Sequence, residues 1–345
     1  MQGICAGIIQ PAALAAIYGG FPASARGTAV GLFSLATAVA AGIGPWFGGM
    51  LVDGFGWRWM FVALAVPSFL AVPLIVIFFP FSRERRTKAP FDWRALFLLA
   101  ASLAMIFAAL DIIADQAGRW VEIVALLAGA VLCLHRFWRN AMQAAEPLID
   151  VRALAHPRIL YASVISFLFG ASLYGPTFLI PLFVNDVMGM SATDAGLLLL
   201  PAGLLLTVGT LVAGYALNTV SLVQMIAFGL IVMAGANLWL SQVGAGYTFV
   251  AVAAIVALGR VGLAAAHPAV HLAIIDSGEL DLGLTAALTN FTRQLGGAFG
   301  VLTLTLVAEW NAPFNPDGFR NAFIASAVML SLGLVAVAMF ARSGK

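Results

Sequence analysis

Long apolar runs are the feature that most constrains what this chain can fold into. A helix crosses the hydrocarbon core of a bilayer with roughly 20 mostly apolar residues, and about eleven such windows follow one another here with short polar breaks between them. They lie near residues 2–20, 28–51, 57–80, 94–113, 120–138, 157–182, 194–217, 221–241, 247–275, 284–308 and 321–341. Charged residues make up only 9% of the chain, whereas a soluble globular chain carries about 25%. We therefore expect an integral membrane protein.

The same runs select the kind of membrane fold. Backbone N–H and C=O groups need hydrogen-bond partners inside lipid, so only helices and closed barrels cross it. The runs lack the alternation of apolar and polar residues that is typical of barrel strands. The sequence therefore predicts an all-α polytopic membrane protein with about eleven transmembrane helices.

Positive charge predicts the orientation. If the C-terminus is cytoplasmic, most of the 17 Lys and Arg residues fall in inner loops, and only Arg58, Arg119 and Arg320 fall in outer ones. Bacterial plasma (inner) membrane proteins show this excess of positive charge on the inner side. An odd number of helices then places Met1 outside with no signal-like segment before it, which favours a chain that lacks preceding helices. The net charge of +2 provides no basic surface, so no nucleic-acid partner is expected.

Two polar stretches divide the chain into three parts. The first stretch reads SRERRTKAPFD (Ser82–Asp92), and the second runs from His135 to Arg158. We predict that residues 1–81 are the remaining three helices of an N-terminal bundle. Residues 82–156 are then a cytoplasmic linker, two extra helices and a second linker, and residues 157–345 are a six-helix C-terminal bundle. Three added helices at the beginning would give two bundles of equal size, as in transporters built from paired halves.

One helix carries a cluster of small residues within ATAVAAGIGPWFGG (Ala36–Gly49). Small side chains let two helix backbones approach closely, and a Pro breaks the helix hydrogen-bond ladder locally. As a bare pattern this occurs in many membrane proteins. The residues that we expect to pack in this way are Gly44, Pro45, Gly48 and Gly49.

The segment VDGFGWRWMF (Val52–Phe61) follows that cluster directly. Together they resemble the antiporter motif and adjoining outer loop of major facilitator drug:proton antiporters. The segments that resemble the fourteen-helix branch of that superfamily, the EmrB/QacA type, are PASARGTAVG (22–31), EPLIDVRAL (146–154), LFVNDVMGMSATDAGLLLLPAGL (182–204) and TNFTRQLGGAFGV (289–301). The resemblance implies the major facilitator fold and proton-coupled export of lipophilic or amphipathic drugs and toxic small molecules by alternating access. It also implies membrane lipid and a periplasmic adaptor as partners.

The chain departs from the family pattern at its beginning. MQGICAG (Met1–Gly7) resembles the later part of the motif on the family's fourth helix, so the first three helices, which carry the proposed proton-binding acid, are lacking. No Asp or Glu lies near the middle of a window, although an intramembrane carboxylate is the usual proton carrier. Two alternatives follow: a truncated or decayed transporter fragment that is inactive alone, or a transporter whose missing helices come from a separate chain.

Two groups of polar residues inside apolar windows are candidates for the pathway. Arg260, His267 and His271 fall on one stripe of a helix, and an Arg in lipid should face protein or water. The two imidazoles could also bind a metal ion, but no third ligand is evident, so we predict no metal site. The second group is Arg293 with Asn290 and Gln294, for which a lipid phosphate or an acid of an inner gate would be a partner.

Four more polar residues are candidates for lining a substrate path: Gln10, Tyr174, Asn185 and Gln224. No Gly-rich loop with Lys and Ser or Thr occurs, so ATP is not the expected energy source. We predict no catalytic residues and no cofactor, and we expect any coupling to be to an ion gradient.

Overall fold

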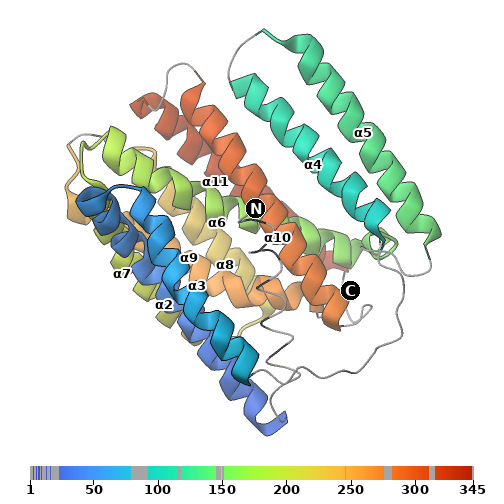
Figure 1. Cartoon of the computed structure of the whole chain (residues 1–345), viewed down its shortest axis with the longest axis horizontal. Helices are drawn as coiled ribbons and strands as arrows, with labels where there is room; N and C mark the ends of the chain where they lie inside the picture. The colour runs from blue at the N-terminus through green and yellow to red at the C-terminus, as the bar shows by residue number, and fades with distance from the viewer. Residues whose placement is uncertain are drawn as a thin grey trace.

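The structure, a computed structural model, is helical throughout the part that it describes. This part consists of residues 23–78, 92–114, 118–144, 149, 151–244, 246–275, 282–310 and 315–343, with six single positions among the first 16 residues. Its elements are α2 (Ala23–Phe55), α3 (Arg58–Phe78), α4 (Trp93–Ala114), α5 (Trp120–Gln143), the 3-10 turn η1 (Ala153–Ala155), α6 (Pro157–Asp186), α7 (Ala192–Ala216), α8 (Leu222–Leu240), α9 (Phe249–Ile275), α10 (Leu282–Glu309) and α11 (Pro316–Ser343). Figure 1 shows the arrangement of the helices.

The prediction of an all-α polytopic membrane fold is confirmed. Every long helix begins and ends close to a predicted apolar window, and all of them except α2 and α10 are long and apolar enough to cross a membrane. α10 contains the polar run TNFTRQ (residues 289–294), which lowers its mean hydropathy. The first predicted window, residues 2–20, lies outside the described residues apart from single positions.

Local sequence signals fix several helix ends. Ser191 and Asp194 form a reciprocal capping box at the beginning of α7, and Ser221 and Gln224 form another at the beginning of α8. Each box provides acceptors for backbone N–H groups that have no partner within the helix. Gly56 joins α2 to α3 with a φ of +88°, a conformation that side chains with a Cβ rarely adopt.

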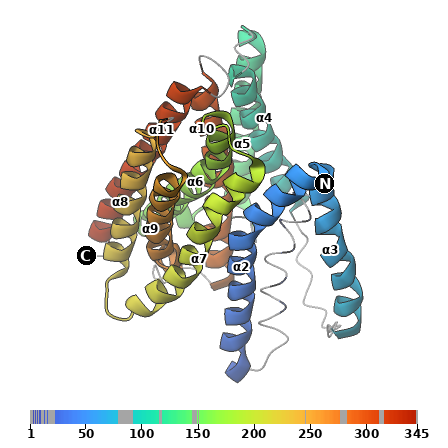
Figure 2. The ribbon, with the colours of Figure 1, turned by 90° about the vertical axis from the view of Figure 1, so that its left-hand side faces the viewer.

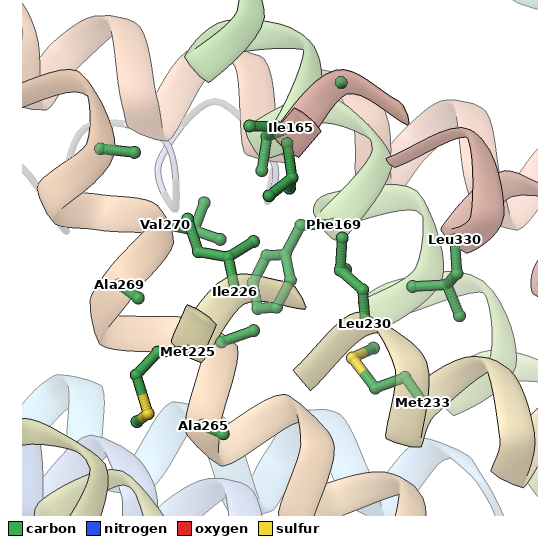
Figure 3. Packing of buried hydrophobic residues seen from close by; sticks show 14 of the residues in the cluster. Ile165, Phe169, Met225, Ile226, Leu230, Met233, Ala265, Ala269, Val270 and Leu330 are labelled. Atoms are coloured by element: carbon green, nitrogen blue, oxygen red, sulfur yellow. The ribbon is translucent and has the colours of Figure 1, made fainter. Parts of the chain in front are cut away.

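The helices α6 to α11 pack around two clusters of buried apolar side chains. The first cluster draws on α6, α8, α9 and α11 and includes Phe169, Ile226 and Leu330, whose side chains converge in Figure 3. The second cluster lies elsewhere among these six helices and includes Phe319 and Phe323. These six helices therefore share continuous apolar packing, in agreement with a bundle over this part of the chain.

The α4–α5 pair stands at one edge of the molecule (Figure 1). Its helices pack on each other through Leu99 and Phe137, and Asn140 Nδ2 donates a 2.8 Å hydrogen bond to Asp92 Oδ2. α4 also contacts α10, where Phe291 packs against the pair. The domain boundaries at residues 81 and 156 stay predictions.

α2 packs along α7, outside the two buried clusters, and α3 contacts α2. In Figure 2, α2 runs between α7 and α3, and α3 lies at the margin of the molecule. No residue in the apolar window of α3 is buried. Large side chains such as Phe69 and Ile77 are more than two thirds exposed, so this helix presents its apolar surface to the membrane or to further helices.

Candidate functional site

Close backbone contact between α6 and α10 positions the polar residues of the candidate site. A Cβ atom on Gly170 of α6 would lie 2.0 Å from the carbonyl oxygen of Arg293, and a Cβ on Gly296 of α10 would lie 1.9 Å from that of Phe167. A Cβ on Gly300 would lie 2.4 Å from Ala171. Such contacts exist only because these positions are glycine, and small residues at helix interfaces are a common means of close packing in membranes.

Arg293 is buried at this contact, with only 7% of its surface exposed. Its Nη1 donates a 3.1 Å hydrogen bond to the hydroxyl of Tyr174 on α6, and its Nη2 donates a 2.8 Å bond to Asn290 Oδ1. Its Nε has no partner within the described part of the chain. No Asp or Glu of the described ranges forms an ion pair with it. The guanidinium is therefore held by two neutral oxygens, so its positive charge is not balanced by a described residue.

His267 and His271 lie one helical turn apart on α9. Their ring centroids are 4.9 Å apart in an edge-to-face arrangement, and the ring of His267 also contacts Phe169 at 6.0 Å. In the described ranges no third His, Cys, Asp or Glu joins the two imidazoles to form a metal-binding group.

Arg260 lies on α9, closer to its beginning than the histidines. Its Nη2 donates a 2.9 Å hydrogen bond to Thr177 Oγ1 on α6. The guanidinium lines a cavity of about 40 Å³ between α6, α8 and α9. Ser172 Oγ and Asn237 Oδ1 also belong to buried residues that line this cavity, and neither atom has a hydrogen-bond partner in the structure as described. Arg260 therefore contacts α6 through Thr177, whereas His267 contacts α6 through Phe169.

The other pathway candidates lie elsewhere. Asn185 is exposed at the end of α6 and donates a 2.9 Å hydrogen bond to the carbonyl of Met190, and Gln224 is exposed in the capping box of α8. Gln294 is exposed on α10, and Gln10 lies outside the described residues. The structure brings Tyr174 together with Arg293, but it shows no contact of Asn185, Gln224 or Gln294 with that pair. Their roles in a path stay predictions.

The small residues of α2 lie along α7. A Cβ on Gly49 would lie 2.2 Å from the carbonyl oxygen of Ala192, and Gly196 of α7 faces the backbone of Pro45 and Trp46. Gly44 and Gly48 do not meet α7: a Cβ on Gly44 would have no atom within 4 Å, and one on Gly48 would meet Met60 at 3.5 Å. Gly203 of α7 approaches Gly42, a position that the sequence analysis did not single out.

Asp53 is a second residue that the sequence analysis did not single out. It lies at the end of α2, and its Oδ2 accepts hydrogen bonds from the backbone N–H (2.7 Å) and the hydroxyl (2.5 Å) of Thr193, in the first turn of α7. These bonds hold the pKa of the Asp53 carboxyl below its usual value. An anion at a helix N-terminus also interacts favourably with the helix dipole. Asp53 therefore links the end of α2 to the beginning of α7.

Comparison with known proteins gives a consistent result. Residues 1–301 match the family model described as Major Facilitator Superfamily. The chain is 25% identical over 309 residues to the multidrug transporter protein MdtP of Bacillus subtilis, covering 89% of this chain and 57% of that protein. It is 26% identical over 269 residues to Multidrug resistance protein 3 of the same species, covering 72% and 52%. It is 28% identical over 360 residues to the drug efflux pump JefA of Mycobacterium tuberculosis, covering 100% and 70%. The chain thus spans little more than half the length of the first two relatives.

Proposed function

Because this chain belongs to the major facilitator superfamily, we propose that it exports lipophilic or amphipathic small molecules across the bacterial plasma membrane by alternating access. The observation that carries this proposal is the buried group formed by Arg293, Tyr174 and Asn290 between apolar helices. Polar and ionisable residues are expensive inside a membrane, and there they usually mark a substrate or ion pathway. The names of the relatives, a multidrug transporter and a drug efflux pump, support the same class of activity.

The contact between α2 and α7 supports alternating access. Glycine positions on both helices place the backbones against each other, and Asp53 bonds to Thr193 at one end of the contact. With the C-terminus in the cytoplasm, this end faces outward. Opening toward the outside then requires the Asp53–Thr193 bonds to break, while the packing within α6 to α11 is retained. In this proposal, exchange with protons drives the cycle, and a periplasmic adaptor receives the substrate.

A second candidate is a chain that transports nothing by itself and needs a partner chain. Two observations favour it. The apolar window of α3 contains no buried residue, as expected for a helix that packs against further helices. Moreover, the described ranges contain no Asp or Glu near the middle of a helix that could carry a proton.

Efflux from cells that lack their own drug exporters tests the proposal. Cells expressing the chain are loaded with the neutral lipophile N-phenyl-1-naphthylamine or with ethidium, and fluorescence is followed after energisation, with and without a pH gradient. We expect faster loss of at least one probe than in cells with an empty vector, and Arg293→Gln should abolish the difference. Arg320→Gln, a change to an exposed cation at the beginning of α11, is the matched control. Loss rates equal to the empty vector for both probes would favour the second candidate.

A further inference from the structure

We propose that Arg260 of α9 and Arg293 of α10, which both donate hydrogen bonds to α6, bind the acidic group of an anionic amphipathic substrate beside the cavity between α6, α8 and α9. This inference rests on the export function proposed above and specifies its substrate class. The two cations lie on different helices, and both donate hydrogen bonds to α6.

Both guanidiniums are attached to the same face of α6. Arg293 of α10 donates to Tyr174, and Arg260 of α9 donates to Thr177. Residues three apart on a helix are neighbours on its surface, with about 5–6 Å between their Cβ atoms. The two cations are therefore bound to residues about one turn apart on α6, so an acidic substrate that enters beside α6 could interact with both.

Neither cation has a carboxylate beside it in the described ranges. Arg119 and Glu122 form the ion pair that the structure shows, at the beginning of α5. The described Asp and Glu residues all lie at or near the ends of helices: Asp53, Asp92, Asp111, Glu122, Asp186, Asp194, Glu309 and Asp317. Buried charges are normally paired, because an unpaired one carries the full cost of its lost hydration. An anion supplied by the substrate would provide the missing charge.

The cavity beside Arg260 provides room for an acidic group. Its volume is about 40 Å³, whereas one water molecule needs roughly 10–15 Å³. This is enough for a carboxylate or a few water molecules, and too small for a whole drug molecule. Ser172 and Asn237, 3% and 6% exposed, line this cavity, and Ser172 Oγ and Asn237 Oδ1 have no hydrogen-bond partner in the described part of the chain. The Ser172 hydroxyl can donate to an anion, and Asn237 Oδ1 can accept from a water molecule bound with it.

The depth of the two cations indicates that the anion is not a lipid headgroup. Arg260 and Arg293 each lie eleven residues from the beginning of their helix. At 1.5 Å per residue this is about 16 Å from a helix end, in helices of 27 and 28 residues that are about 40 Å long. Lipid phosphates lie at the membrane surface. The ligand is therefore a molecule that enters the bundle, and guanidinium groups suit a carboxylate, sulfonate or phosphate because they donate two parallel hydrogen bonds.

A matched pair of fluorescent probes tests this charge preference by binding, independently of transport. 1-Anilinonaphthalene-8-sulfonate carries a sulfonate on the same aromatic skeleton as the neutral N-phenyl-1-naphthylamine. Both are titrated into the full chain in phosphatidylcholine nanodiscs, with empty discs subtracted. We expect the anionic probe to bind about tenfold more tightly, as expected for hydrogen bonds to a charged group.

Variants assign the preference to the two arginines. In Arg260→Gln and Arg293→Gln the ratio of the two affinities should fall toward one, whereas Arg320→Gln should keep it. Binding of the neutral probe by each variant shows that the variant is folded. If the Gln variants do not fold, displacement from the wild-type chain by octanoate compared with octanol makes the same comparison, and octanoate should be the stronger competitor.

The outcomes distinguish this inference from the export function. Equal affinity of the two probes, or equal competition by octanoate and octanol, would overturn the anionic preference and leave export of neutral compounds in place. Binding of neither probe would overturn both. Displacement of the anionic probe by phosphatidylglycerol added to the discs would show that the site belongs to a lipid headgroup, and would also overturn the inference.

Discussion

Replacing Gly170 by Ala should loosen the contact that holds Arg293 against Tyr174. A Cβ at this position would lie 2.0 Å from the Arg293 carbonyl oxygen and 3.0 Å from its Cα, both of them backbone atoms that cannot rotate away. Ordinary contact begins near 3.4 Å, so α6 and α10 must separate locally by about 1.4 Å. A hydrogen bond of 3.1 Å between Arg293 and Tyr174 does not survive a displacement of that size unless the side chains move with it.

The expected energy follows from two opposing terms. Forcing an extra methyl group into a packed interior costs about 1–3 kcal/mol. The higher helix propensity of Ala returns at most about 1 kcal/mol. The net destabilisation relative to the wild type is about 0–2 kcal/mol, and about 1–3 kcal/mol relative to a Gly→Ala change that gains the same helix propensity without a clash. The hydrogen bond that positions Arg293 is lost as well.

Thermal unfolding of the purified chain in detergent, followed by tryptophan fluorescence, measures this effect. Gly235→Ala on α8 is the matched control, because a Cβ there would meet no atom within 4 Å, and it should melt at or above the wild-type temperature. We expect Gly170→Ala to melt several degrees below the control. If Gly170→Ala melts together with Gly235→Ala, the close contact between α6 and α10 does not exist in the folded protein, and the placement of Arg293 must be revised.

Two further predictions concern single hydrogen-bonding groups. Tyr174→Phe leaves a donor of the buried Arg293 without its acceptor, so it should lower the free energy of unfolding by about 1–3 kcal/mol. The control is Tyr215→Phe, at a side chain that is 78% exposed, which should leave the melting temperature unchanged. Equal melting temperatures of the two variants would argue against the Arg293 contact. Asp53→Asn should melt at a lower temperature than the wild type at pH 7. The reason is that the pKa of the Asp53 carboxyl is lowered in the folded protein, so the carboxylate adds stability above its ordinary pKa of 3.8. This stability is lost as the pH falls through the lower pKa of the folded protein. The difference should therefore shrink below about pH 4, and a difference that is the same at pH 3 and pH 7 would mean that the Asp53 charge does not act through Thr193.

Much of the fold could be predicted from the sequence because long apolar runs directly indicate which segments form membrane-spanning helices. The apolar window predicted at residues 94–113 coincides with α4, and the other described long helices coincide with predicted windows in the same way. Hydropathy does not report which neighbour a helix side faces. Tyr174 and Arg293 are 119 positions apart, and Asp53 and Thr193 are 140 apart, so neither pair has a signal in the local pattern.

Some of the missed information was local and could have been found. Ser221 precedes Gln224 by three residues, which is the spacing of a capping box, and this spacing gives Gln224 a structural role at a helix start. Asn237 is the single Asn in α8 and lies among apolar residues, and a polar amide at that depth indicates a polar neighbour. The Arg260 cavity itself could not be predicted, because it depends on how three helices meet.

The two guanidiniums near the middle of the helices also have an electrical consequence. Moving one elementary charge across a membrane potential of 100 mV changes the free energy by about 2.3 kcal/mol. An empty carrier brings the fixed charges of Arg260 and Arg293 through part of that field when it reorients, whereas a carrier neutralised by an anionic substrate does not. With a negative cell interior, the voltage would therefore act mainly on the inward return of the empty carrier and so favour net export.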